Sequence, residues 1–201
     1  MMKLRGPKHR LARRFGVNIT GTTSRSLEAR LQQPPGMHGA KRRRKLSDYG
    51  EQLREKQKVR AMYGAPEGQF RRYFQEATRL PGRPGDNLLR LLELRLDNIV
   101  YRLGFARTRP MARQLVNHGH ILVNGRRVNI PSYQVHLGDV VQLGAAAQRF
   151  TPVMEALAHP SAPIPVWLER LDTSGRVRTL PGPQDFEPHI NADLIVAYYS
   201  R

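Results

Sequence analysis

Between residues 47 and 79 the hydrophobic positions repeat with the spacing of two helices. Ser47 is an N-cap residue type, and the first helix is expected to end near Tyr63 because Gly64 and Pro66 follow. The second helix carries apolar residues at relative positions i, i+3, i+4 and i+7, which are Phe70, Tyr73, Phe74 and Ala77. We expect this stripe to form core rather than to stack bases, because base-stacking platforms usually lie on sheets or loops.

A Pro- and Gly-rich segment, residues 80–85, has no hydrophobic period and reads as a linker between modules. Asp86 is then expected to cap one long helix over residues 87–103, whose apolar positions trace a single stripe. Gly104 supplies the left-handed residue that a helix C-terminus prefers.

A further helix is predicted to begin at Thr108, with Pro110 in its first turn, and to end at Gly119. Apolar residues occupy one side of it, while Arg109 and Arg113 lie four residues apart on the other. We expect the apolar side to pack and the arginine side to present cations. Replacing both arginines by alanine should then leave thermal unfolding nearly unchanged.

The period then changes to that of strands. Residues 121–123 and 126–128 are short β-prone runs separated by Asn124-Gly125. This dipeptide best supplies positive φ at both centres of a type I′ turn, so a hairpin is expected. Residues 139–143 are predicted to be a third strand.

The rest of the pattern predicts a helix, a second hairpin and a terminal element. Residues 145–158 have helical character, and residues 166–171 and 176–180 flank a four-residue turn. Residues 192–199 are apolar enough to be a helix or a strand docked on the body, and Asn191 is a suitable N-cap.

The charge of the chain indicates a polyanionic partner. The 201 residues contain 34 Lys and Arg against 16 Asp and Glu, a net charge of +18, and residues 1–45 hold 13 basic residues and one acid. Such self-repulsion destabilises a free compact state unless a polyanion neutralises it, and a nucleic acid backbone is the obvious polyanion. With few hydrophobes between its charges, this segment is expected to be poorly ordered, or only partly structured, without its partner.

Other chemistries have little support. No apolar run approaches the ~20 residues of a membrane helix and no export signal is visible, so we expect a cytoplasmic protein with no membrane partner. The chain has no cysteine, and His118 and His120 have no third ligand nearby in sequence, so no metal is expected. Phosphate-loop, dinucleotide, zinc-protease and serine-hydrolase motifs are missing, so we expect no catalytic residue, no cofactor and no enzymatic activity.

Arginine is the abundant cation, and its planar fork matches phosphate oxygens while its flat face stacks on unpaired bases. RNA is the favoured nucleic acid. A DNA-binding regulator stays open on charge alone, without a helix-turn-helix spacing, zinc knuckle or leucine zipper to support it.

One stretch carries a resemblance to a known family. Residues 95–143, RLDNIVYRLGFARTRPMARQLVNHGHILVNGRRVNIPSYQVHLGDVVQL, closely resemble the RNA-binding module named after the fourth protein of the bacterial small ribosomal subunit. This module also occurs in pseudouridine synthases, a tRNA synthetase and small stress proteins. Four more stretches are similar to the full-length ribosomal protein family: GPKHRLARR (6–14), PPGMHGAKRRRKLSDYGEQLREKQKVRAMYG (34–64), PGRPGDNLL (81–89) and NADLIVAYYSR (191–201).

The alternative is an RNA-modifying enzyme of the pseudouridine synthase type that carries the module as an appendage. Residues 1–94 and 160–201 would then have to hold a catalytic domain, but they are too short and too basic.

The resemblance implies an α+β fold. A mainly helical domain with a basic N-terminal extension is expected, plus an inserted small RNA-binding module of two helices packed on an antiparallel sheet. The expected division is 1–45 for the extension, 46–94 completed by 165–201 for the helical domain, and 95–164 for the module.

The resemblance also implies a function. It predicts a structural constituent of the small subunit and a primary rRNA-binding protein that nucleates assembly at a multi-helix junction of the 5′ domain. Basic residues near the channel through which mRNA enters, a role in translational accuracy and autoregulation in some bacteria are further implied. The implied partners are small-subunit rRNA, mRNA, and the neighbouring small-subunit ribosomal proteins number five and number three, on the ribosome in the cytoplasm.

Roles in rRNA contact carry over to matching positions. In the N-terminal segment these are Lys8, Arg10, Arg13, Arg14, His38, Lys41, Arg42, Arg43, Arg44 and Lys45, of which His38 and residues 41–45 also lie toward the mRNA side. In the helical part they are Tyr49, Arg54, Lys56 and Lys58, and Arg71 and Arg72 face away from the apolar stripe. In the module they are Arg107, Arg109, Arg113, His118, His120, Asn124 and Arg126.

The chain departs from part of the family in two places. Many relatives carry a cysteine cluster that binds zinc or an iron–sulfur cluster, and the matching residues 21–39 contain none, so packing and rRNA must hold this region. Met37 also stands within Pro35-Gly36-Met37-His38-Gly39 where the ordinary motif has glutamine, so a thioether replaces an amide.

Overall fold

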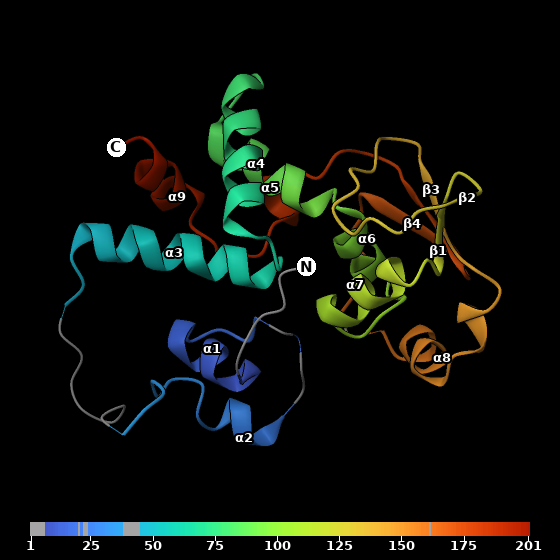
Figure 1. Cartoon of the computed structure of the whole chain (residues 1–201), viewed down its shortest axis with the longest axis horizontal. Coiled ribbons are helices and arrows are strands. Elements are labelled where there is room, and N and C mark those ends of the chain that lie inside the picture. The colour runs from blue at the N-terminus through green and yellow to red at the C-terminus, as the bar shows by residue number, and fades with distance from the viewer. Residues whose placement is uncertain (1–6, 20, 22–23, 38–44, 161) are drawn as a thin grey trace. The chain divides into compact units, whose positions relative to one another are not determined.

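The computed structural model describes residues 7–19, 21, 24–37, 45–160 and 162–201 and divides into two compact units (Figure 1). The helical unit comprises Met1–Gly85 and Pro188–Arg201, and the sheet unit comprises Asp86–Glu187. Across the described ranges, no helix combines the length and apolar character needed to cross a membrane.

In the helical unit two expected helix starts are confirmed, the one after Ser47 and the one after Asn191. Its described helices are α1 Lys8–Phe15, α2 Arg25–Glu28, α3 Asp48–Met62, α4 Glu67–Arg79 and α9 Ala192–Tyr199, and α5 Pro84–Glu93 begins at its boundary. The Ser47 hydroxyl accepts a hydrogen bond from the N–H of Gly50 over 3.2 Å, and the Asn191 side chain accepts from the N–H of Asp193 over 3.1 Å. Both side chains therefore cap a helix, and the terminal element is helical.

The apolar stripe of α4 is buried, as its spacing predicts. Phe70 and Ala77 are fully buried, and Tyr73 and Phe74 nearly so. The ring of Tyr199 in α9 stacks on that of Phe74 with centroids 4.6 Å apart. Because each large apolar side chain contributes roughly 1.5–3 kcal/mol on burial, this stripe holds the C-terminal helix against α4.

Part of the basic N-terminal segment is regular structure. Within residues 7–37 the chain forms α1 and α2, and Ala12, Phe15 and Leu27 are buried. This segment therefore buries an apolar set of its own, although its sequence is dominated by charge.

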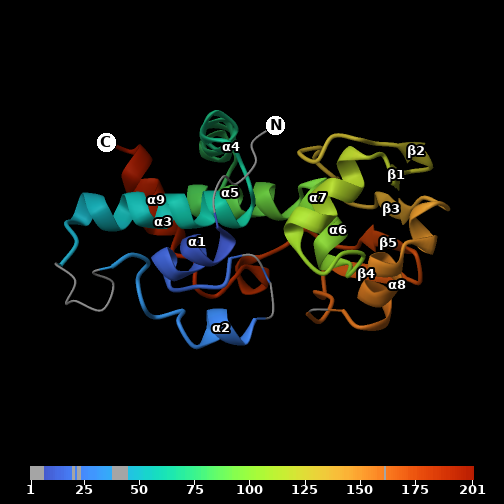
Figure 2. The same ribbon diagram turned by 60° about the horizontal axis from the view of Figure 1, so that its bottom comes forward.

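The sheet unit contains a five-stranded antiparallel sheet, and its strands follow one another in the order β2-β1-β3-β5-β4 from top to bottom of Figure 2. The strands are β1 Ile121–Val123, β2 Arg126–Arg127, β3 Val140–Leu143, β4 Leu168–Leu171 and β5 Ser174–Val177. The helices are most of α5, then α6 Leu96–Arg102, α7 Arg109–Asn117, α8 Thr151–Ala158 and the 3-10 turns η1 Ala147–Arg149 and η2 Pro183–Asp185. The α+β class is confirmed.

The hairpin at Asn124-Gly125 is also confirmed. These residues have φ of 49° and 77°, the two positive values that a type I′ turn requires. Val123 pairs with Arg126 across the turn.

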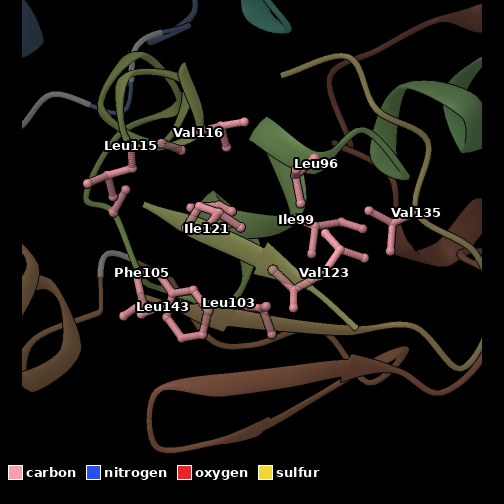
Figure 3. Close-up of a cluster of buried hydrophobic side chains, with 14 of the residues drawn as sticks. Leu96, Ile99, Leu103, Phe105, Leu115, Val116, Ile121, Val123, Val135 and Leu143 are labelled. Atoms are coloured by element: carbon pink, nitrogen blue, oxygen red, sulfur yellow. The ribbon is translucent and has the colours of Figure 1, made fainter. Parts of the chain in front are cut away.

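Figure 3 shows the core of the sheet unit, which forms between α6, α7 and the inner strands. The buried side chains are Leu96 and Ile99 from α6, Leu103 directly after α6, Leu115 and Val116 from α7, and Ile121, Val123 and Leu143 from β1 and β3. Two helices therefore pack on an antiparallel sheet, as the resemblance implies.

The expected single helix over residues 87–103 is wrong, because the chain breaks it between α5 and α6. The expected cap at Asp86 is also wrong, because α5 begins at Pro84 and Asp86 lies in its first turn. The N–H of Leu96 donates to the carbonyl of Tyr133 over 2.9 Å, and the N–H of Asp97 to that of Pro131 over 3.1 Å. Arg95 is extended, with φ −67° and ψ 139°, and its buried guanidinium donates to Asp97 over 2.7 Å. Backbone bonds to a distant segment thus replace helical ones, which local spacing cannot reveal.

The domain boundaries of the structure also differ from the expected ones. The sheet unit ends at Glu187 rather than at residue 164, because the second hairpin extends the sheet. Val140 of β3 lies opposite Arg176 of β5. This pairing satisfies an edge of β3 that would otherwise be open to other chains.

Residues 145–158 form two elements rather than the one expected helix. Phe150 is extended, with φ −76° and ψ 122°, and separates η1 from α8. Pro152 lies in the first turn of α8, where its missing N–H costs little.

Candidate nucleic-acid interface

Several of the predicted rRNA contacts in the helical unit are exposed. Arg10 and Arg14 lie on α1, Arg71 and Arg72 on the outward side of α4, and Lys45 just before α3. Lys8 also belongs to α1, whereas His38 and residues 41–44 lie outside the described residues. The exposed arginines offer guanidinium forks that can bind phosphate oxygens, and Lys45 offers an ammonium group.

Arg13 and Arg54 are instead bonded to the protein backbone. Arg13 donates to the carbonyls of Gln33 and Pro34, each over 2.9 Å. Arg54 donates to the carbonyls of Arg14 and Phe15 at the end of α1, over 3.3 and 3.2 Å. These two predicted contacts therefore organise the N-terminal segment.

Lys56 and Lys58 are buried in ion pairs, although the resemblance implies that both contact rRNA. Lys56 Nζ lies 2.8 Å from the carboxylate of Glu67 and 4.3 Å from the ring centroid of Tyr198. Lys58 Nζ lies 2.7 Å from Glu55. Along α3, Arg54 is partly exposed, whereas Lys56 and Lys58 lie on the buried side of the helix.

The carboxyl of Glu67 joins these groups electrostatically. Burial raises its pKa, but the hydrogen bond and positive charge of Lys56, with the hydroxyl of Tyr199 and the charge of Arg60, outweigh burial and lower the pKa below its ordinary value. The same contact acts in the opposite direction on Tyr199, whose pKa is raised by burial and by the Glu67 charge.

Tyr49 is half exposed at the start of α3. Its ring centroid lies 5.7 Å from that of Tyr198, and the guanidinium of Arg201 lies 5.8 Å from its ring. This edge of the helical unit therefore offers an aromatic ring beside a cation.

In the sheet unit, the structure places Arg109 mostly inside rather than on an exposed cationic face. Its Nη2 lies 2.8 Å from Glu187, its Nε donates to Asn98 over 2.9 Å, and its guanidinium lies 4.6 Å from the ring of Tyr101. Only 13% of the side chain is exposed.

Arg113 is similarly enclosed, with Nη1 3.6 Å from the carboxylate of Asp97 and 19% of the side chain exposed. Asn124 is exposed but holds the hairpin to β3: its amide donates to Asp139 over 2.8 Å and accepts from the N–H of Val140 over 2.9 Å. These residues shape the surface through internal bonds.

The remaining predicted contacts of the module face solvent. Arg107 is half exposed and lies 3.4 Å from Glu155, and Arg126 is exposed on β2 with no described residue bonded to its guanidinium. His118 is exposed at the end of α7, and His120 is partly exposed before β1. In the described part of the chain, no group of three His, Cys, Asp or Glu is placed to hold a metal ion.

An open pocket of about 420 Å³ lies between α7, the start of β1 and the start of α8. Its apolar lining comes from Met111, Leu115, Phe150, Pro152 and Val153, and its polar lining from Gln114, His118, His120, Arg149 and Thr151. The rings of His120 and Phe150 meet edge to face at 4.9 Å.

Sequence reasoning found the two histidines of this pocket but missed Gln114, Arg149 and Phe150. Reading residues 145–158 as one helix hid the extended Phe150. Pro152 was the available signal, because proline marks the first turn of a helix.

Family comparisons agree with this architecture. Residues 3–93 match the ribosomal protein S4/S9 N-terminal domain, and residues 94–141 match the S4 domain. The match defines a ribosomal protein that carries an S4 RNA-binding domain.

Full-length relatives identify the family. The chain is 48% identical to small ribosomal subunit protein uS4 of Brevibacillus brevis, 50% identical to that of Roseiflexus sp. and 49% identical to that of Xylella fastidiosa, each over 100% of both chains. The chain therefore belongs to the uS4 family of small ribosomal subunit proteins, a family of structural proteins and not of enzymes.

Proposed function

We propose that this chain is a structural constituent of the small ribosomal subunit that binds its rRNA. The observation that carries the proposal is the match to uS4 proteins over the whole length at about half identity. An RNA-modifying enzyme is not favoured, because residues 3–93 match a ribosomal domain rather than a catalytic one.

The exposure of each predicted contact separates residues proposed to bind rRNA from residues that stabilise the protein. Double-stranded RNA is recognised mainly through its shape, phosphates and 2′-hydroxyls, for which outward guanidinium groups are suited. The proposed rRNA contacts with exposed or partly exposed side chains are Arg10, Arg14, Lys45, Tyr49, Arg71, Arg72, Arg107, His118, His120 and Arg126. Lys8, His38 and residues 41–44 remain proposed contacts from their motif. Arg13, Arg54, Lys56, Lys58, Arg109, Arg113 and Asn124 instead hold the surface in shape.

At a finer level, the protein acts as a primary binder that nucleates assembly at a multi-helix junction of the 5′ domain. Its other partners are mRNA near the channel through which it enters and the small-subunit ribosomal proteins number five and number three. An effect on translational accuracy and repression of its own operon complete the proposal. The resemblance over the full chain, rather than any single contact, supports these points.

Footprinting on naked small-subunit rRNA tests the central claim. The full chain should protect one junction in the 5′ domain, and the protection should survive when competitor duplex DNA is added. Protection scattered over unrelated helices would contradict primary binding. Co-sedimentation with the small subunit after a high-salt wash should separately confirm stable incorporation, and complete release would oppose it.

A further inference from the structure

The pocket beside α7 is lined by the proposed rRNA contacts His118 and His120, and also by Gln114, Arg149 and Phe150, which the proposed contacts do not include. Its volume of about 420 Å³ lies within the range of small-ligand sites, about 300–1,000 Å³. We propose that it takes one unstacked nucleobase of small-subunit rRNA. This inference rests on the proposed function and adds a second mode of contact to the exposed cations.

Phe150 supplies the stacking surface. Its side chain is 39% exposed although it is large and apolar, and its ring lies perpendicular to that of His120. Aromatic rings stack on unpaired bases of any identity, because every base has a π face. The backbone at Phe150 is extended between η1 and α8, and its side chain belongs to the pocket lining.

The polar lining matches a nucleotide rather than an apolar peptide side chain. Gln114 is exposed on α7 and offers both amide donors and an acceptor to a base edge. Arg149 is exposed, no described residue is bonded to its guanidinium, and it can bind the adjoining phosphate.

The balance of charge around the pocket points the same way. Arg149, His118 and His120 belong to the lining, and no carboxylate does. Glu155, on the same helix as Val153, lies outside the lining, 3.4 Å from Arg107. A ligand that pairs an aromatic ring with negative charge is therefore favoured over a basic or purely apolar partner.

Ultraviolet crosslinking of the full wild-type chain to naked small-subunit rRNA tests the proposal, because short-wavelength light joins side chains to bases and not to phosphates. Mass spectrometry should find one nucleotide attached to a peptide that contains His120 or Phe150. Binding and crosslinking are then repeated with Phe150→Leu, which keeps apolar bulk and removes the ring, and with Phe150→Tyr, which keeps it.

Phe150→Leu should weaken rRNA binding by roughly 5- to 150-fold, the loss expected for one stacked base, and abolish the crosslink. Phe150→Tyr should stay close to the wild type, and circular dichroism should show all three chains folded. If the wild type binds rRNA and Phe150→Leu binds equally well, the pocket inference is overturned while the proposed function stands. If the wild type binds no rRNA, both fail. A crosslink from the pocket to a neighbouring ribosomal protein in assembled subunits would also overturn the base assignment.

Discussion

Glu93 and Arg102 form a two-point ion pair inside the sheet unit. Arg102 Nη2 donates to one carboxylate oxygen over 2.7 Å and Nε to the other over 3.0 Å, and the Glu93 side chain is fully buried. Asn98 also donates to this carboxylate over 2.7 Å. The pair joins the end of α5 to the end of α6 across the break that the sequence pattern does not reveal.

Arg102→Ala should strongly destabilise the fold. The substitution leaves the buried charge of Glu93 without its main partner, which costs about 3–5 kcal/mol. Urea denaturation followed by circular dichroism measures this loss of unfolding free energy. Arg176→Ala is the matched control, because Arg176 pairs with Glu169 at the surface, where such pairs contribute at most about 1 kcal/mol. Equal losses in the two variants would contradict the buried pair.

The double variant Arg109→Ala with Arg113→Ala should lower the thermal unfolding midpoint, contrary to what the sequence alone predicts. Both guanidiniums are mostly enclosed, and their removal takes one partner from Glu187, which keeps Arg102, and one from Asp97, which keeps Arg95. The expected cost is about 2–5 kcal/mol. Differential scanning calorimetry on the free protein measures the unfolding midpoint. An unchanged midpoint would mean that the two arginines do not stabilise the fold and would favour a direct role in RNA contact.

Local signals explain why so much of the fold is predictable. The cap at Ser47, the positive φ pair at Asn124-Gly125 and the stripe beginning at Phe70 each depend on residues within a few positions, and each is confirmed. Their chemistry is determined by short-range sterics and hydrogen bonding, so sequence spacing is sufficient.

The failures share long sequence separations. Arg109 reaches Glu187 across 78 positions, and Leu96 bonds to Tyr133. From sequence alone, a basic residue is expected at the surface, because a charge is buried only when it is paired and the distant partner is not visible in the local pattern. The pocket could not be predicted for the same reason, because its lining residues Gln114 and Phe150 come from segments that are distant in sequence.

Arg126→Ala should weaken rRNA binding without changing stability. Its side chain is exposed on β2 and no described residue is bonded to its guanidinium. One lost phosphate contact should reduce the slope of log affinity against log salt by about one unit. Filter binding at several salt concentrations measures the slope.

Two comparisons make the Arg126 result interpretable. Arg176→Ala removes an exposed arginine of β5 that is already paired with Glu169, and it should leave the slope unchanged. A lowered unfolding midpoint in Arg126→Ala would show a structural role instead.

Glu67→Gln should change stability in a pH-dependent way. Because the pKa of Glu67 is lowered in the folded state, chiefly by Lys56 against the effect of burial, its contribution is fully present above the unfolded pKa and is lost as pH falls through the folded pKa. The stability difference between wild type and Glu67→Gln should therefore be largest near neutral pH and shrink below about pH 4.3. Urea denaturation between pH 7 and pH 3 measures the unfolding free energy of both chains. If the difference between them did not change with pH, the ionisation of Glu67 would not contribute to stability.

Gly85→Ala should destabilise the helical unit even though alanine is the better helix former. An added Cβ at Gly85 would lie 2.8 Å from Cβ of Ala192, too close for two methyl groups, so α9 must shift at a cost of about 1–3 kcal/mol. Gly68→Ala on α4 is the matched control, because its new methyl group meets nothing within 4 Å and should stabilise by about 0.5–1 kcal/mol. Urea denaturation should therefore move the two midpoints in opposite directions. If both midpoints rose, the helix propensity of alanine would determine stability at both positions, and the start of α5 would not pack against α9 in solution.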